Sequence, residues 1–255
     1  MLIEDLRLAY DRVAFARTLG IQPDPWQRDL LNSAADRVIL NCSRQSGKSL
    51  MSAVIALHRA VYDEGSLTLV LAPSERQAKE TFGKVLSLYR KLGHTVSSDS
   101  HRKLGLELTN GSRIEALPGS EKTIRGFSAV DLLVLDEAAR VADDLYHALR
   151  PMLAVSGGAL IMLSTPAGER GAFWESWEYG DGWERYRVSA EQVPRISPEF
   201  LAEERAALPG RVYRQEYECS FEALEGAIFT MEEIMAVVTD DVPPLFPSEA
   251  ERAAS

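Results

Sequence analysis

The sequence has 255 residues, 45% of them hydrophobic and 26% charged, which suffices for the core of one large α/β domain with at most a small appendage. Its two cysteines and four histidines exclude a disulfide scaffold and show no zinc spacing. No apolar run approaches a membrane span in length, and acids stand near the amino terminus where a signal peptide has lysines. We therefore expect an intracellular protein with no membrane partner.

The net charge of −10 argues against a surface that is basic throughout. The charge is unevenly distributed along the chain. Residues 75–126 contain ten basic and six acidic residues, whereas residues 127–255 contain ten basic and 24 acidic residues. A polyanion would therefore meet the middle third of the chain.

Residues 2–19 mix apolar residues with arginine and aspartate and predict a helix that ends at Gly20. Two prolines then fix an extended entry to a helix that begins near Trp26. Gln27 lies where many nucleic-acid-driven ATPases keep a glutamine that pairs with adenine. An amide suits this pairing because it donates and accepts at once. The alternative is a glutamine that faces solvent beside a packed Trp26.

Residues 38–55 read VILNCSRQSGKSLMSAVI, which predicts a buried strand, a tight polar loop and a helix that starts near Lys48. The backbone N–H groups of such a loop and the positive end of the helix bind phosphate. Lys48 would reach the β- and γ-phosphate oxygens, and the Ser49 hydroxyl would bind Mg²⁺. The preceding loop residues that would surround the nucleotide are Ser43, Arg44, Gln45, Ser46 and Gly47. Cys42 replaces the first glycine of the usual G-x-x-x-x-G-K-[ST] pattern, and an ordinary turn before a helix is the alternative.

The next segments predict a strand, a helix and a hairpin. Residues 67–72 (LTLVLA) form a continuous apolar run of the buried-strand type, which Pro73 ends. Ser74 is the expected cap of a helix that closes at Gly93. Residues 104–117 predict a hairpin with an Asn-Gly turn.

Residues 130–135 predict a further buried strand, and it ends in Asp136 and Glu137. In a phosphate-loop ATPase the first carboxylate holds the magnesium ion through water and the second polarises the attacking water. Residues 159–163 predict another strand, followed by Ser164 and Thr165, whose hydroxyls can sense the γ-phosphate. For Asp136 and Glu137 the alternative is a surface acidic pair that starts a helix. For Ser164 and Thr165 the alternative is a plain turn.

The carboxyl-terminal third predicts one strand and two short helices. The strand ERYRVSA follows a segment with three tryptophans, which we interpret as core residues rather than base-stacking groups. Residues 197–223 predict two helices that Pro209 and Gly210 separate, in a small lid. The composition beyond residue 240 is that of a linker or tail.

Three motifs together resemble the ATPase domain of a bacteriophage large terminase subunit, the motor that packs DNA into capsids. They are CSRQSGKS at 42–49, LLVLDEAA at 132–139 and LSTPAG at 163–168. Terminases often lack the first loop glycine and carry Arg-Gln inside the loop, so Cys42 agrees with the resemblance. It runs over most of residues 20–225, and YRQEYECSF at 213–221 resembles the end of this domain.

The resemblance implies a role for each matching residue. Lys48 and Ser49 take phosphate and magnesium, Asp136 takes magnesium, and Glu137 acts on the water. Gln27 binds adenine, Thr165 couples hydrolysis to movement, and Arg44 lies near the γ-phosphate. Arg125 is assigned as an arginine finger that acts on the neighbouring subunit. Arg140, acting in cis, is the alternative. Either residue could instead be an ordinary surface arginine.

The expected fold is an α/β P-loop NTPase of the ASCE or RecA-like type. It has a mostly parallel sheet flanked by helices, with an extra strand between the phosphate-loop strand and the Asp-Glu strand. The expected divisions are an ATPase core at 1–195, a helical lid at 196–240 and a linker or tail at 241–255. The sequence leaves no room for the family's nuclease domain after Phe221. We therefore expect no DNA cleavage, and either a truncated chain or the product of a split gene.

The expected function is ATP hydrolysis, with Mg²⁺, coupled to translocation of double-stranded DNA into a viral capsid in the host cell cytoplasm. The resemblance implies a ring, pentameric in the family, with the capsid portal and the small terminase subunit as partners. Arg102, Lys103 and Arg113 lie in or beside the hairpin and are the candidates for contacts with DNA phosphates, unless they form a solvated charged loop. The alternatives are a helicase-type translocase, which needs a second motor lobe, and a nucleotide-binding scaffold without turnover, which Glu137 disfavours.

Overall fold

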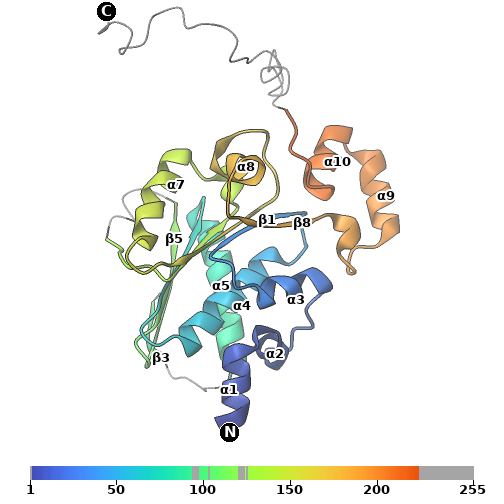
Figure 1. Ribbon diagram of the computed structural model, residues 1–255. Helices are drawn as coiled ribbons and strands as arrows, with labels where there is room; N and C mark the ends of the chain where they lie inside the picture. Colours follow the sequence, from blue (N-terminus) through green and yellow to red (C-terminus); the bar gives the residue numbers. More distant parts are fainter. Residues whose placement is uncertain (1, 94–97, 103, 120–123, 125, 224–255) are drawn as a thin grey trace, which may run out of the picture. The chain divides into compact units, whose positions relative to one another are not determined.

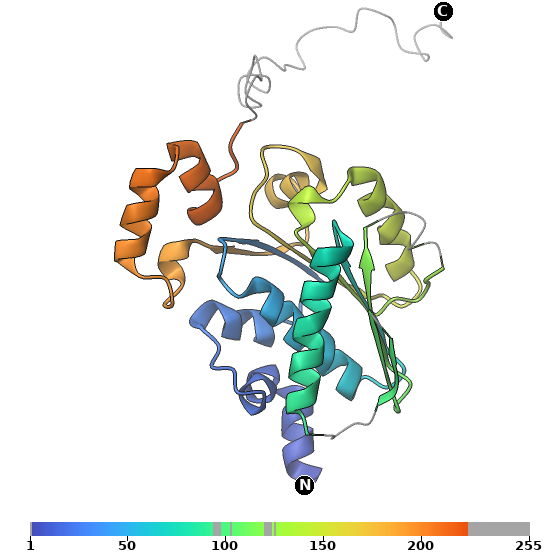
Figure 2. The same ribbon diagram turned by 180° about the vertical axis from the view of Figure 1, so that it is seen from behind.

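The computed structural model describes residues 2–93, 98–102, 104–119, 124 and 126–223, and for residues 2, 3 and 98–102 it describes the backbone alone. The chain divides into two compact units, Met1–Glu222 and Ala223–Ser255. Every helix and strand of the described residues belongs to the first unit. Figure 1 and Figure 2 show the chain from opposite sides.

A single eight-stranded sheet organises the first unit, with the strand order β3-β4-β5-β2-β6-β7-β1-β8. The strands are β1 (Arg37–Cys42), β2 (Leu67–Ala72), β3 (Ser98–Arg102), β4 (Gly105–Leu108), β5 (Arg113–Pro118), β6 (Leu132–Asp136), β7 (Ala159–Ser164) and β8 (Glu184–Val188). Every pairing from β5 to β8 is parallel, whereas β4 pairs antiparallel with both β3 and β5. The expectation of a mostly parallel sheet is confirmed, and β7 is the extra strand expected between β1 and β6.

Helices cover both faces of the sheet, and two more follow β8 beyond its edge (Figure 1). The first group is α1 (Leu2–Tyr10), α2 (Arg12–Thr18), α3 (Pro25–Asn32), α4 (Lys48–Tyr62) and α5 (Glu75–Lys91). The opposite face carries α7 (Asp143–Leu149) and α8 (Gly171–Glu178), and the helices after β8 are α9 (Pro198–Ala207) and α10 (Gly210–Tyr217). Three short 3-10 helices are η1 (Ala138–Arg140), η2 (Arg150–Leu153) and η3 (Ala190–Gln192).

Two hydrophobic clusters hold the helices on the two faces of the sheet against the strands. β6 is apolar at successive positions because both of its faces are covered, and alternate side chains enter different clusters. Val134 packs in the cluster that contains Phe82 of α5, and Leu133 packs in the cluster that contains Phe173 of α8. Because helices cover both faces of the sheet, polar side chains emerge from the core at the carboxyl ends of β1, β6 and β7.

Most predicted elements are present, with two differences at the amino-terminal half. The helix expected over 2–19 is two helices, because Asp11 caps the second one and its Oδ1 accepts a hydrogen bond from the Ala14 backbone at 2.7 Å. Strand β3 was not expected, since its sequence SDSHR has no apolar alternation. It pairs antiparallel with β4 at the edge of the sheet.

The predicted hairpin is confirmed, as are the strand, the core tryptophans and the two helices of the carboxyl-terminal third, whereas the division into a lid and a tail stays a prediction. Gly111 adopts φ +82° in the connection between β4 and β5, a backbone conformation that favours glycine. Trp174 is buried, and Trp177 and Trp183 pack partly buried against the second cluster, so the tryptophans are core residues. Two helices, α9 and α10, lie on either side of the Pro209-Gly210 break. Among the described helices, none combines the length and the apolar character that crossing a bilayer requires.

Candidate nucleotide-binding site

The loop between β1 and α4 has the backbone geometry that its sequence predicts. Gly47 is the residue before the first turn of α4 and adopts φ +93°, a conformation that favours glycine. A Cβ at this position would lie 2.9 Å from Nε2 of Gln27, so close approach also requires glycine here. Cys42 is fully buried at the end of β1, which explains why an apolar side chain is accepted at the first position of the loop. Burial raises the pKa of its thiol above the ordinary range.

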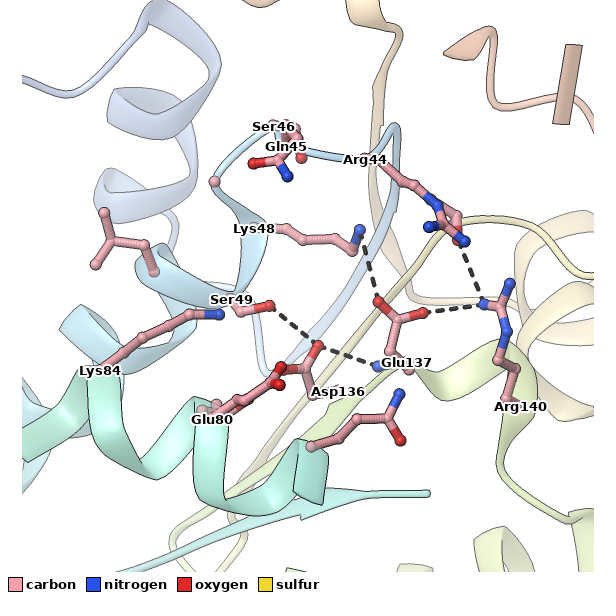
Figure 3. A pocket seen from close by; sticks show the side chains of 15 residues that line it. Arg44, Gln45, Ser46, Lys48, Ser49, Glu80, Lys84, Asp136, Glu137 and Arg140 are labelled. Carbon is pink, nitrogen blue, oxygen red and sulfur yellow. Dashed lines mark hydrogen bonds and ion pairs between the residues drawn. The ribbon is translucent and has the colours of Figure 1, made fainter. Parts of the chain in front are cut away.

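The loop and the acidic pair meet in one pocket at the carboxyl edge of the sheet (Figure 3). Its volume of about 510 Å³ is in the range of sites that hold small organic ligands. Lys48 Nζ lies 3.8 Å from Oε1 of Glu137, and Ser49 Oγ donates to Oδ1 of Asp136 at 3.2 Å. The lining residues are Arg44, Gln45, Ser46, Gly47, Lys48, Ser49, Leu50, Gln77, Glu80, Thr81, Lys84, Asp136, Glu137, Arg140 and Thr165.

Asp136 is a buried carboxylate whose neighbours suit a hard cation. Its Oδ1 accepts hydrogen bonds from Ser49 Oγ and from the Glu137 backbone at 3.1 Å, and its Oδ2 accepts one from Thr81 Oγ1 at 2.5 Å. No lysine, arginine or histidine of the described residues forms an ion pair with it. A carboxylate and a hydroxyl oxygen are ligands that Mg²⁺ accepts together with phosphate and water oxygens. The described residues contain no cluster of three or more His, Cys, Asp or Glu side chains that would hold a metal without them.

Glu137 lies between two cations at the start of η1. Its backbone is in the left-handed region at φ +54°, and its carboxylate faces Lys48 on one side and Arg140 Nη1, at 3.0 Å, on the other. Arg140 Nη1 also lies 3.3 Å from Oγ1 of Thr165, to which it donates. Thr165 is therefore connected to Glu137 through Arg140.

Arg44 lies at the rim of the pocket, where α10 holds it. Its guanidinium pairs with the carboxylate of Glu216, and its backbone N–H donates to the Glu216 carbonyl at 3.3 Å. The hydrogen bond and the charge of Glu216 raise the pKa of Arg44. The loop is thus joined to the helical segment that follows β8.

Gln27 lies behind the loop and does not line the pocket. Its Nε2 donates to the Ser46 carbonyl at 3.2 Å, and its Oε1 accepts from the Asp24 backbone at 3.0 Å. The side chain is 3% exposed, so both ends of the amide are used inside the protein. Its pairing with adenine stays a prediction. Arg195 reaches the same carbonyl from the segment before α9, with Nη2 at 3.1 Å, while Asp24 holds its Nη1 at 2.8 Å.

Sequence reasoning missed Arg195 and one face of α5. Arg195 has no local signal, since its contacts join segments far apart in the chain. The α5 residues were detectable in principle, because Gln77, Glu80, Thr81 and Lys84 recur at helical spacing. In Figure 3, Glu80 and Lys84 extend from α5 into the pocket.

Of the three candidate DNA-contacting residues, only Arg113 is described with its side chain, and it does not line this pocket. Arg113 begins β5, which runs parallel to β2, so it lies toward the amino edge of the sheet and the pocket lies at the carboxyl edge. Lys103 and Arg125 lie outside the described residues, and of Arg102 only the backbone is described.

A mostly parallel sheet with the nucleotide loop after β1, the Asp-Glu pair after β6 and β7 between them defines the RecA-like class of P-loop NTPases. A family model described as "Terminase large subunit, T4likevirus-type, N-terminal" matches residues 39–236. The chain belongs to this terminase family.

Individual relatives agree with the family. The large terminase subunit of Escherichia phage T5 is 27% identical over 224 residues, covering 82% of this chain and 50% of the relative. The large terminase subunit of Thermus virus P23-45 is 26% identical over 253 residues, covering 85% of this chain and 52% of the relative. The chain therefore spans about half the length of the curated relatives it matches.

Solved structures of the family share the fold. The large terminase ATPase domain of Thermus phage P74-26 has a TM-score of 0.72 and 25% identity, with 82% of this chain and 97% of that chain covered. The large terminase of bacteriophage HK97 has a TM-score of 0.65 and 21% identity, with 79% of this chain and 51% of that chain covered. The second likeness concerns the fold alone.

Proposed function

We propose that this chain is an ATP-hydrolysing motor domain that couples turnover to translocation of double-stranded DNA into a phage capsid. One observation carries the proposal: Lys48 and Ser49 at one strand end share a pocket with Asp136 and Glu137 at another. The similarity to the large terminase ATPase domain of Thermus phage P74-26 supports it.

Each side chain has a defined task in this proposal. The Lys48 ammonium, now beside the Ser43 carbonyl and Glu137, binds the β- and γ-phosphate oxygens of ATP. Ser49 and Asp136 hold Mg²⁺, which supplies charge neutralisation at the phosphates when bound. Glu137 orients the attacking water and accepts its proton.

The arrangement around Glu137 suits a carboxylate that changes partners. Lys48 faces its Oε1 and Arg140 holds its Oε2. When Lys48 moves to phosphate, Oε1 becomes free for a water molecule while Arg140 keeps the side chain in place. Through Arg140 the position of Glu137 also depends on Thr165, the residue assigned to coupling.

We further propose that Arg125 of a neighbouring subunit completes the site in a ring, with double-stranded DNA, the capsid portal and the small terminase subunit as partners in the host cytoplasm. Arg140 is the alternative finger in cis, favoured by its place in the pocket. ATP hydrolysis measured against protein concentration, with and without duplex DNA, tests the shared site. A rate that rises more steeply than the protein concentration supports it, and no turnover under any condition would instead favour a nucleotide-binding scaffold.

The DNA contact has its own test. If Arg113 binds a backbone phosphate, Arg113→Ala should weaken DNA binding at low salt and reduce the slope of log K against log salt concentration by about one. Arg170→Ala, which removes a positive charge outside the hairpin, serves as a control. An unchanged slope for Arg113→Ala would remove this residue from the DNA surface.

A further inference from the structure

Helix α5 forms a wall of the pocket that none of the predicted motifs includes. Four of its side chains line the cavity, and Thr81 is the most deeply placed, with 2% of its surface exposed. Its Oγ1 donates to Oδ2 of Asp136 at 2.5 Å. The contact joins the helix after β2 to the carboxylate after β6.

The two oxygens of Asp136 have different surroundings. Oδ1 faces Ser49 and the backbone N–H of Glu137, which is the side where the nucleotide loop lies. Oδ2 faces away from these groups and has Thr81 as its hydrogen-bond donor among the described residues. Rotation about the terminal torsion of an aspartate is soft, so a hydrogen bond at one oxygen restrains the direction of the other, most of all when Ser49 turns to a metal ion.

We propose that Thr81 is a positioning residue for the magnesium site: its hydroxyl holds Oδ2 of Asp136 so that Oδ1 stays beside Ser49. This inference rests on the proposed ATPase function and deepens it. Removing the hydroxyl leaves Oδ2 buried without a donor and lets the carboxylate turn, which weakens metal binding. Nucleotide binding through Lys48 and the loop backbone does not need this carboxylate and remains in the absence of metal.

A structural role alone would have a different signature. If Thr81 merely joins α5 to β6, its removal lowers the melting temperature and affects nucleotide binding equally with and without metal. A positioning role instead changes the ratio of two dissociation constants, one measured in EDTA and one in magnesium. This ratio reports the contribution of the metal and does not require turnover.

The chain offers a matched control for the loss of a threonine hydroxyl. Thr68 in β2 is fully buried, and its Oγ1 has no hydrogen-bond partner within the part of the chain that the structure describes. Thr68→Val therefore makes the same chemical change at another buried threonine, in β2 instead of α5, without removing a hydrogen bond to Asp136. Thr81→Ser retains a hydroxyl and serves as the rescue variant.

The experiment measures binding of a fluorescent, non-hydrolysable ATP analogue to the full chain. In Thr81→Val the ratio of the EDTA constant to the magnesium constant should fall about tenfold, the low end of the range for residues that support metal ligands. Thr81→Ser and Thr68→Val should keep the wild-type ratio. Electron paramagnetic resonance of bound Mn²⁺ at saturating analogue should show the same loss in Thr81→Val.

The outcomes separate the two proposals. A folded Thr81→Val protein with a ratio within twofold of wild type overturns the role of Thr81. If circular dichroism shows Thr81→Val to be unfolded, the same ratio measured on Thr81→Ala decides. An Asp136→Asn background provides the mechanism test, because Thr81→Val should change nothing further there. Wild-type protein that binds no analogue in either buffer would overturn the ATPase proposal instead.

Discussion

Lys48 and Glu137 form an ion pair across β7, with 3.8 Å between Nζ and Oε1. Lys48 is the first residue of α4, after the loop that follows β1, and Glu137 directly follows β6, so the pair joins the two halves of the proposed catalytic site. The Glu137 side chain is a quarter exposed, so the pair is partly screened and contributes little to stability. The pair matters for the proposed mechanism, because Glu137 becomes free to bind water when phosphate replaces it as the partner of Lys48.

Glu137→Gln should separate binding from hydrolysis. Glutamine keeps the shape of the side chain but cannot accept the proton of the attacking water. We expect the dissociation constant for ATP to change by less than about threefold, while kcat falls by about 10²- to 10⁴-fold. Isothermal titration with a non-hydrolysable analogue and a phosphate-release assay measure the two quantities. A variant that hydrolyses ATP at the wild-type rate would remove Glu137 from the reaction.

The choice between Arg125 and Arg140 is decided by mixing defective subunits. Arg125→Ala and Lys48→Ala proteins should each be inactive, and their mixture should regain ATP turnover if Arg125 acts on a neighbour. Arg140→Ala should not be rescued by Lys48→Ala protein, because Arg140 lies in the same pocket as its own Glu137. An arginine finger contributes about 10³-fold or more in kcat, so the signal is large. Full activity of Arg125→Ala protein under assembling conditions would contradict its role.

The sequence was sufficient for the parts of this site that depend on strand ends. Apolar runs ending in Asn41, Asp136 and Ser164 are local patterns, and parallel strands bring their carboxyl ends to the same edge. The meeting of Lys48 with the Asp-Glu pair follows from this rule. Thr81 and Arg195 could not be assigned in this way, because their contacts depend on how α5 and the segment before α9 pack. Gln27 illustrates the converse: its pairing with adenine stays a prediction, and its partners in the structure are the Ser46 carbonyl and the Asp24 backbone.

Because of the two buried cysteines, the free energy of unfolding should fall as the pH becomes alkaline. Burial raises the pKa of Cys219 to about 12 and that of Cys42 above the ordinary range. A thiol whose pKa is higher in the folded chain than in the unfolded chain stabilises the fold. This contribution is complete when the pH is below the ordinary thiol pKa of about 8.5, and it is lost as the pH rises from there toward the pKa in the folded chain. Chemical denaturation from about pH 7 to about pH 10 should therefore show a falling free energy of unfolding. Replacing both cysteines with alanine should flatten this dependence, and an equally steep fall in that variant would contradict the assignment.

Arg195 should tighten nucleotide binding without touching the nucleotide. It and Gln27 are the two side-chain donors to the Ser46 carbonyl, at 3.1 and 3.2 Å, and together they fix the peptide before Gly47. Loss of one hydrogen bond of about 0.5 to 1.5 kcal/mol corresponds to a rise of about two- to twelvefold in the dissociation constant for ATP. Arg195→Lys should be only partly effective, because an ammonium cannot hold Asp24 and Ser46 with one planar fork.

A matched change on α9 separates this effect from a general loosening of the helices after β8. Arg205 pairs with Glu218 and lies over the ring of Tyr213, and none of its described ion pairs involves the nucleotide loop. Arg205→Ala should therefore leave the dissociation constant for ATP unchanged while Arg195→Ala raises it. Equal increases in both variants would show that the packing of α9 and α10, and not the bond to Ser46, controls the loop. Fluorescence titration with the same ATP analogue measures both constants under one set of conditions.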